Sequence, residues 1–264
     1  MALVTFLTDF GLGDQYVAQM KGVVLKGCPG CQIVDLSHMV RRYDIAEASF
    51  LLETTVPYFP RGTIHVVIVD PGVGGRRLPI IVKCRSATLV GPDNGVLEFA
   101  ASRLGFVAAY KIRETLLNSS TASSTFHGRD IFAEAAASLA CGRLPELMGT
   151  KLATIVRIER PKPRISKKQL TCAVLHVDTF GNVVTNVANH FAKGRFRLGQ
   201  RLRIESRIVA RVARYATTYS DVRLGELTVL QGSQGYIELA AREDSASELV
   251  GLKVRDELII SPAS

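Results

Sequence analysis

The first half of the chain alternates short apolar runs with longer stretches in which apolar positions recur every three or four residues. Apolar runs bounded by turn residues predict strands, and the longer spacing predicts helices. The expected strands are 4–7, 32–36, 65–69 and 80–83, and the expected helices are 16–26, 45–56 and 96–104. This alternation favours an α/β domain, a mostly parallel sheet in Rossmann-like layers with helices on its faces.

The second half has a different pattern, built from short segments rich in β-branched residues. The segments 170–177, 195–204 and 235–239 are separated by turn residues, which predicts a smaller all-β domain, either barrel or sandwich. The expected organisation is therefore an α/β domain at 1–158, a linker at 159–169 and an all-β domain at 170–264.

The composition indicates the number of domains and the compartment of the protein. With 264 residues and 47% hydrophobic residues, the chain is long enough for two domains with substantial cores. No apolar stretch reaches the length of a membrane span, and the start lacks a basic leader region, so we expect a cytoplasmic protein without membrane contact.

Five irregularly spaced cysteines fit a reducing compartment. The CPGC at 28–31 follows an expected helix and precedes an expected strand, which favours a simple turn over a redox pair or a zinc site.

The net charge of +9 raises the possibility of a nucleic-acid partner. The densest basic segment, RIERPKPRISKK at 157–168, contains two prolines and no interleaved aromatic residues, so it is more typical of a solvated linker. No nucleic-acid motif accompanies the charge, and no nucleic-acid partner is expected.

One polar cluster follows the apolar run 64–69, which ends in Asp70, a proline, three glycines and Arg77. Charged groups at the carboxyl end of a buried strand lie where α/β sheets bind their ligands. The glycine-rich turn could hold an anion, and it could equally be a simple turn with an exposed arginine.

Other polar clusters lie at similar places. The segment TDFGLGD at 8–14 carries Asp9 and Asp14, whose carboxylates suit ribose hydroxyls or an ammonium group, or cap the next helix. Its glycine spacing is not that of a dinucleotide fingerprint. PDNG at 92–95 is typical of a turn and is expected only to support its neighbours.

His127 stands at the start of the expected helix 131–139, with Asp130 able to serve free helix amides. A lone histidine is more often structural, but a gathering of these groups at one sheet edge would favour a catalytic site.

Six ordered motifs give the chain a family resemblance that runs nearly from end to end. It looks like the S-adenosyl-L-methionine hydroxide adenosyltransferases, relatives of the fluorinase and chlorinase. The motifs are TDFGLGDQYVAQMKG (8–22), IVDLSH (33–38), IHVVIVDPGVGGRR (64–77), PDNGVL (92–97), TFHGRDIFA (125–133) and DTFGNVVTN (178–186). The resemblance implies hydrolysis of S-adenosyl-L-methionine to adenosine and L-methionine, by attack of an activated water at the ribose 5′ carbon. It implies no cofactor and no metal, because the sulfonium is already a good leaving group.

The resemblance assigns water activation to Asp70, Arg77 and His127, and leaves open which of them takes the proton. Arg76 is a neighbour that could be confused with Arg77. The halide enzymes have a tyrosine at the position of Asp70 and can have a fluoride-binding serine at that of Gly128, so hydroxide is the expected nucleophile.

The resemblance also implies a set of substrate-binding residues. Asp9 matches the residue that binds the ribose diol, Tyr43 one that covers the nucleoside, and Phe126 would wall the reacting carbon. Gly128 is also counted with the substrate-binding residues. Asp178, Ser233 and Asp14 match groups at the methionine end, and Phe180 and Asn182 match the adenine site. From the residues alone, a hairpin turn is the preferred interpretation of 178–182. The chain departs from the pattern at Gln234, where the halide enzymes have arginine, and at 241–247, which lacks the expected asparagine and glycine.

Family members are trimers whose sites lie between the first domain of one subunit and the second domain of its neighbour, so a homotrimer is expected here. Two alternatives remain. One is a halide-dependent adenosyltransferase, disfavoured by Asp70, and the other is a nucleoside- or S-adenosylmethionine-binding protein without turnover.

Overall fold

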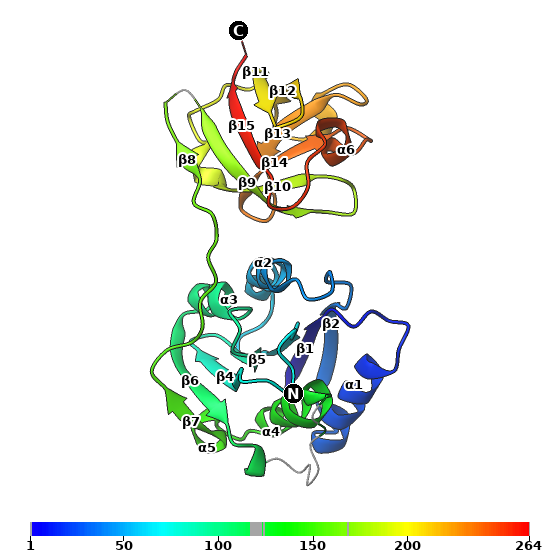
Figure 1. Cartoon of the computed structure of the whole chain (residues 1–264), viewed down its shortest axis with the longest axis vertical. Coiled ribbons are helices and arrows are strands. Elements are labelled where there is room, and N and C mark those ends of the chain that lie inside the picture. Colours follow the sequence, from blue (N-terminus) through cyan, green and yellow to red (C-terminus); the bar gives the residue numbers. More distant parts are fainter. Residues whose placement is uncertain (1, 117–122, 124, 168, 264) are drawn as a thin grey trace. The chain divides into compact units, whose positions relative to one another are not determined.

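The structure is a computed structural model that describes residues 2–116, 123, 125–167 and 169–263. The chain divides into two compact units, residues 1–158 and 159–264, and each is described by itself (Figure 1).

A seven-stranded sheet forms the centre of the first unit. Its order is β2-β1-β3-β5-β4-β6-β7, where the strands are β1 (Leu3–Thr8), β2 (Gln32–Ser37), β3 (Ile64–Ile68), β4 (Pro79–Cys84), β5 (Thr88–Pro92), β6 (Phe106–Ile112) and β7 (Gly149–Leu152). Strands β2, β1, β3 and β5 are parallel, and β5, β4, β6 and β7 pair antiparallel. The expectation of a mostly parallel, Rossmann-like sheet therefore holds for one half only. The turn between β4 and β5 is too short for the crossover that a parallel pair needs.

Helices cover both faces of this sheet (Figure 1). They are α1 (Tyr16–Gly27), α2 (Ile45–Thr55), α3 (Glu98–Arg103), α4 (Glu134–Ala140) and α5 (Pro145–Met148), with a π-helical turn η3 (Gly128–Ala133) before α4 and 3-10 turns η1 (Val56–Tyr58) and η2 (Glu114–Leu116). Alternate residues of one strand point to opposite faces. Phe6 of β1 accordingly joins the core under α1 and α4, and Leu7 joins the core under α2 and α3.

Most expected elements of this unit are present within a few residues. The apolar run before PDNG proves to be a central strand, β5. The helix expected at 131–139 begins earlier, as the π-helical turn at Gly128.

The second unit is a closed barrel, which decides between the barrel and sandwich alternatives. The strands are β8 (Arg164–Ile165), β9 (Leu170–Val177), β10 (Val183–Ala188), β11 (Arg201–Glu205), β12 (Ala210–Tyr215), β13 (Leu227–Gln231), β14 (Tyr236–Ala241) and β15 (Glu257–Pro262). Seven of them follow the order β10-β14-β13-β12-β11-β15-β9, and a β9–β10 pairing closes the ring. The unit also has a short helix, α6 (Ala246–Val250), and 3-10 turns η4 (Asn189–Phe191) and η5 (Tyr219–Asp221).

Two expectations about this unit change in detail. Residues 159–169, expected to be a linker, are counted with the barrel: β8 pairs with β9, and the Asn186 side chain donates a hydrogen bond to the Pro161 carbonyl at 2.7 Å. The strand expected at 195–204 is reduced to β11, because residues 194–200 form turns around Gly194 and Gly199, both with positive φ.

All five cysteines are free thiols, and Cys28 and Cys31 lie in the turn between α1 and β2, as expected for the CPGC. Among the described residues, no group of three or more histidine, cysteine or acidic side chains could hold a metal ion. Within the same part of the chain, no helix has both the length and the apolar character needed to cross a membrane.

Candidate functional site

A cavity of about 350 Å³ lies in the first unit, where β1 and β3 end side by side. Asp9 follows β1, Asp70 follows β3, and His127 immediately precedes η3. Because β1 and β3 are parallel, their carboxyl ends bring these groups to one edge of the sheet. The cavity is lined by Asp9, Phe10, Asp14, Tyr16, Arg42, Tyr43, Ile68, Asp70, Val73, Thr125, Phe126, His127 and Gly128. Every site residue that the sequence predicted for this unit lines it, except Arg77.

Arg77 is not a lining residue of the cavity, but its side chain joins Asp70 to His127. Its Nε donates to both Asp70 carboxylate oxygens, at 3.0 and 2.8 Å, and its Nη2 donates to Oδ2 at 2.5 Å. The same Nη2 lies 2.7 Å from His127 Nδ1. The Arg77 and Asp70 side chains are only 9% and 5% exposed, so this ion pair is poorly screened by water. The alternative of an exposed arginine on a simple turn is therefore wrong.

The glycine-rich turn brings Arg77 back onto Asp70. The Val73 and Gly75 amides donate to the Asp70 and Gly72 carbonyls, and Gly74 has a φ of 73°, which favours glycine. Asn94 of the PDNG turn also steadies this region, because its Nδ2 donates to the carbonyl of Val69, the residue before Asp70, at 2.9 Å. The PDNG turn thus has the supporting role expected of it.

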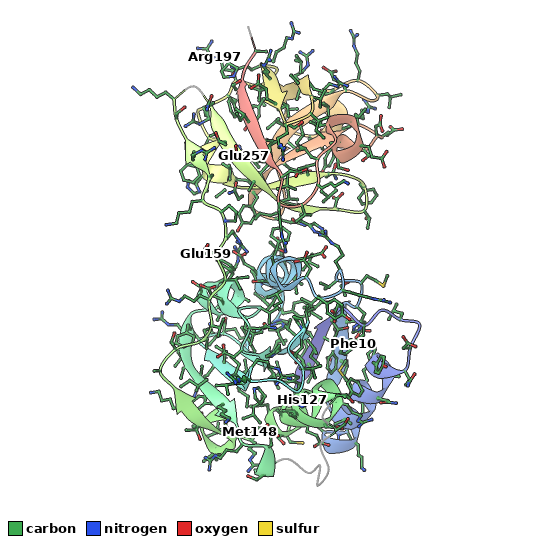
Figure 2. The ribbon with its side chains drawn as sticks, in the orientation of Figure 1. Phe10, His127, Met148, Glu159, Arg197 and Glu257 are labelled. Atoms are coloured by element: carbon green, nitrogen blue, oxygen red, sulfur yellow. The ribbon has the colours of Figure 1, made fainter. Side chains whose placement is uncertain are left out.

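The contact with Arg77 identifies the protonation state of His127. A guanidinium only donates hydrogen bonds, so His127 Nδ1 must accept, and the ring proton of the neutral imidazole lies on Nε2. Burial lowers the pKa of His127 below its usual value, and the positive charge of Arg77 lowers it further, against the opposite effect of Glu114, Asp70 and Asp130. His127 (Figure 2) is therefore a neutral hydrogen-bond donor at its Nε2 atom.

The helix that follows His127 is held differently from the expectation. Asp130 was expected to serve the free helix amides, but its Oδ2 accepts from the Ser123 amide at 2.8 Å and its Oδ1 from Arg129 Nε at 2.6 Å. No side chain caps η3. Burial would raise the pKa of Asp130, but the hydrogen bonds from Arg129 and Ser123 outweigh it and hold that pKa below its usual value.

Gly128 lies in a tight place between the cavity and the core. A Cβ atom there would lie 3.0 Å from the Phe126 ring, 3.2 Å from Met20 Sδ and 3.4 Å from Ile68 Cδ1. A larger residue at Gly128 therefore forces its neighbours to move.

Asp9 and Asp14 do not cap helix α1, because its N-cap is Gln15 and no side chain caps it. One Asp9 oxygen, Oδ2, instead accepts from the Tyr43 amide at 2.8 Å. Tyr43 has a φ of 66°, unusual for a residue other than glycine, and the residue is 69% exposed. The bond to Asp9 stabilises this conformation, which brings Tyr43 to the cavity.

Aromatic side chains form an apolar wall that the sequence reasoning found only in part. The Phe126 ring contacts Phe10 and Tyr16 edge to face, with ring centroids 6.0 and 5.1 Å apart. Phe10 (labelled in Figure 2) and Tyr16 belong to the 8–22 motif. Their positions on either side of Asp14 could have identified them from the sequence as residues of the site. Arg42 and Val73 also line the cavity and were not predicted.

The second unit has a separate hollow of about 890 Å³, which is lined by Asp178, Phe180, Asn182, Thr218, Tyr219, Ser220, Ala241, Arg242, Glu243, Asp244 and Ser245. Three residues predicted for substrate binding are among them. Asp178 Oδ1 accepts from the Phe180 and Asn182 amides, and its Oδ2 accepts from Asn182 Nδ2, each at 2.9 Å. Residues 178–182 thus form a hairpin turn, three residues of which line the hollow, and Phe180 is 79% exposed.

Ser233 and Tyr219 differ from the sequence expectations. Ser233 is exposed in the turn between β13 and β14 and is not a lining residue of this hollow. Tyr219 was missed, although its hydroxyl donates to the buried Glu238 at 2.8 Å. Burial, and to a smaller extent this hydrogen bond, raises the pKa of Tyr219 to about 12. Burial also raises the pKa of Glu238.

Comparisons with known proteins identify relatives along nearly the whole chain. Models of the SAM hydroxide adenosyltransferase N-terminal and C-terminal domains match residues 4–149 and 172–259. A Salinispora tropica protein named (R)-S-adenosyl-L-methionine hydrolase is 36% identical over 98% of this chain and 97% of its own length. A Nocardia brasiliensis fluorinase is 27% identical over 95% and 94% of the two chains. The crystal structure of an uncharacterized conserved protein from Thermotoga maritima superposes with a TM-score of 0.94 at 35% identity, and covers 98% of this chain and 99% of that one.

Proposed function

The chain belongs to the SAM hydroxide adenosyltransferase family, and from that premise we propose that it hydrolyses S-adenosyl-L-methionine to adenosine and L-methionine. The observation that carries the proposal is the chain of contacts from Asp70 through Arg77 to His127 beside a cavity. This chain of contacts supports the proposal because a carboxylate, a buried cation and a neutral imidazole beside a cavity are suited to hold and deprotonate a water.

Asp70 is the group that takes the proton. The Nδ1 lone pair of His127 is occupied by Arg77, and its Nε2 carries a proton, so His127 donates to the water and orients it. Asp70 lines the cavity, and its Oδ1 accepts a single hydrogen bond from Arg77, so a second lone pair of this oxygen is proposed for the water. Arg77 provides the counter-charge of the Asp70 carboxylate.

The reaction is a single in-line displacement. The water oxygen forms a bond to the ribose 5′ carbon while the bond from that carbon to sulfur breaks, and the electron pair of that bond returns to sulfur to leave methionine. The water proton passes to Asp70 and then to solvent. A sulfonium leaves without an acid, so the proposed reaction uses no metal and no cofactor. The apolar wall of Phe126 and Phe10 limits water near the reacting carbon.

Two features favour water over halide as the nucleophile. The Asp70 carboxylate lines the cavity and repels an anion, whereas it attracts a proton from water. Gly128 leaves no room for a serine hydroxyl without displacement of Phe126 or Met20.

The substrate-binding assignments extend this proposal. Asp9 holds Tyr43 through one oxygen, and its other oxygen is proposed for the ribose hydroxyls. Asp14 suits the substrate ammonium group. In the second unit, Phe180 suits stacking on adenine, and Asn182 suits its edge. Asp178 and Ser233 remain proposals for the methionine end, and Asp178 already accepts three bonds of its own turn.

We also propose a cytoplasmic homotrimer in which each site combines units of neighbouring subunits. Light scattering on the purified protein tests the trimer, and a monomer with full activity would contradict it.

The activity test is incubation of the purified chain with S-adenosyl-L-methionine in ¹⁸O-water, followed by chromatography and mass spectrometry. Adenosine and methionine should form in equal amounts, with ¹⁸O in the 5′ hydroxyl, at a rate independent of chloride and of prior dialysis against a chelator. Asp70→Asn should abolish turnover while it leaves binding intact. A 5′-halogenated product would support the halide alternative, and unchanged substrate would support a binding protein.

A further inference from the structure

A chain of polar contacts beneath the turn that carries Asp9 runs from Lys21 and Asp35 at the surface to His38 and Thr8 in the interior. His38, 3% exposed, has its Nδ1 atom 2.9 Å from the Oγ1 of Thr8, which is fully buried. On the other side of the ring, Nε2 lies 3.1 Å from Asp35 Oδ1, and Asp35 Oδ2 accepts from Lys21 Nζ at 2.5 Å. All four residues come from the 8–22 and 33–38 motifs, and none of them has a role in the mechanism above.

The donors and acceptors of this chain have one consistent direction. Lys21 only donates, and the Asp35 carboxylate only accepts, so the carboxylate oxygen 3.1 Å from His38 Nε2 favours the ring proton on Nε2. Burial acts to raise the pKa of Asp35, but the hydrogen bonds from Lys21 and His38 outweigh it and hold that pKa below its usual value. His38 Nδ1 therefore accepts the Thr8 hydroxyl proton, and Thr8 Oγ1 accepts from the Phe10 amide at 3.3 Å.

His38 consequently holds the turn at two points on either side of Asp9. Its ring fixes the Thr8 hydroxyl, which bonds the Phe10 amide, and its carbonyl accepts from the Gly11 amide at 2.8 Å. Asp9 lies between these anchors, with one oxygen already used to hold Tyr43. The direction of the second oxygen is then set by the backbone of residues 8–11.

We propose that His38 is a positioning residue that, through Thr8, orients the Asp9 carboxylate for the two ribose hydroxyls of the substrate. This inference rests on the proposed role of Asp9. It predicts that loss of His38 weakens recognition of the ribose diol and leaves the displacement step at Asp70 nearly unchanged.

His65 provides a matched control within the same sheet. It is fully buried, its Nδ1 lies 2.7 Å from the hydroxyl of Thr5, and Thr5 stands three residues before Thr8 on β1. Both histidines thus bond a β1 threonine, but His65 contacts no residue of the cavity turn in any described hydrogen bond. A purely structural role predicts the same effects for the two histidines.

The experiment compares His38→Ala with His65→Ala in the full chain by two readouts, steady-state kinetics with S-adenosyl-L-methionine and calorimetric binding of adenosine and 2′-deoxyadenosine. His38→Ala should raise KM about tenfold with kcat within about threefold, because a hydrogen bond to a charged group is lost from binding. The preference for adenosine over 2′-deoxyadenosine should fall by a similar factor. His65→Ala should lower the melting temperature and leave both KM and that preference unchanged.

Conservative variants sharpen the test and guard against misfolding. His38→Asn places an amide oxygen near the position of Nδ1 and should restore most of the ribose preference. Thr8→Val should reproduce the loss without a change in His38, and Thr8→Ser, which keeps the hydroxyl, should not. In an Asp9→Ala background, His38→Ala should have no further effect on KM, because both act through one carboxylate.

The outcomes separate this inference from the proposed function. If His38→Ala changes the ribose preference no more than His65→Ala does, or if its effect adds fully to that of Asp9→Ala, the positioning role is wrong even when hydrolysis is confirmed. If the unaltered chain binds adenosine but does not turn over S-adenosyl-L-methionine, the proposed function is wrong, and the two nucleoside affinities still decide the role of His38.

Discussion

Replacement of Arg77 by methionine tests the centre of the proposed site. Methionine keeps much of the side-chain volume and removes every hydrogen bond to Asp70 and His127. The wild-type pair is 9% and 5% exposed with N–O distances of 2.5 to 3.0 Å, so the variant would leave the Asp70 carboxylate buried without a counter-charge. Removal of one partner of a buried ion pair costs about 3–5 kcal/mol. We expect the free energy of unfolding to fall by about this amount, and kcat/KM to fall about a hundredfold or more.

Urea unfolding and steady-state kinetics measure these changes, and Arg76→Met is the matched control. Arg76 is an exposed neighbour on the same turn and has no hydrogen bond or ion pair among those of the described residues, so its replacement should change neither quantity appreciably. Asp70→Asn combined with Arg77→Met should recover part of the lost stability, because no charge then remains buried. If Arg77→Met costs no more stability than Arg76→Met, or if Arg76→Met is the variant that loses activity, the assignment of Arg77 is refuted.

Further predictions concern other parts of the molecule. Burial lowers the pKa of His65 to about 4, so between pH 6.5 and 4 the folded chain binds fewer protons at this residue than the unfolded chain. The free energy of unfolding should therefore fall by roughly 3 kcal/mol as the pH drops from 6.5 to 4. In urea unfolding of His65→Leu, the free energy of unfolding should depend less on pH. Because His127 must be neutral and its pKa is lowered below 6.5, kcat/KM should be constant near neutral pH and decline with a midpoint more acidic than 6.5, and a midpoint above 6.5 would contradict this. Gly128→Ser should lower the melting temperature and give no halogenated product in chloride, whereas a halogenated product would show that Gly128 alone selects water. Phe180→Ala should raise KM about tenfold through loss of a stacking partner, whereas Tyr58→Ala, which removes a similarly exposed ring from the first unit, should not.

Much of the first unit was predictable because local pattern determines its elements. The spacing of apolar residues located α1 and α2 within a residue or two, and placed Asp9, Asp70 and His127 at element ends. The direction of the later strands was not predictable in this way. Whether β4 and β5 pair antiparallel depends on the length of the turn between them and on which strands lie beside them. The apolar pattern of a single segment reveals neither.

The sequence by itself determined which residues are available for chemistry: a carboxylate after a buried strand, an arginine seven residues later and a histidine before a helix. It left open whether Arg77 was exposed, whether Asp9 capped α1 and which way His127 was protonated. Tertiary structure decided all three, because each depends on contacts between residues far apart in the chain. Arg77 and His127 are 50 positions apart, and Asp9 and Tyr43 are 34. Hydrogen-bond direction and burial at such contacts arise only when separate strands and helices pack together, and those two quantities govern the charge of the site.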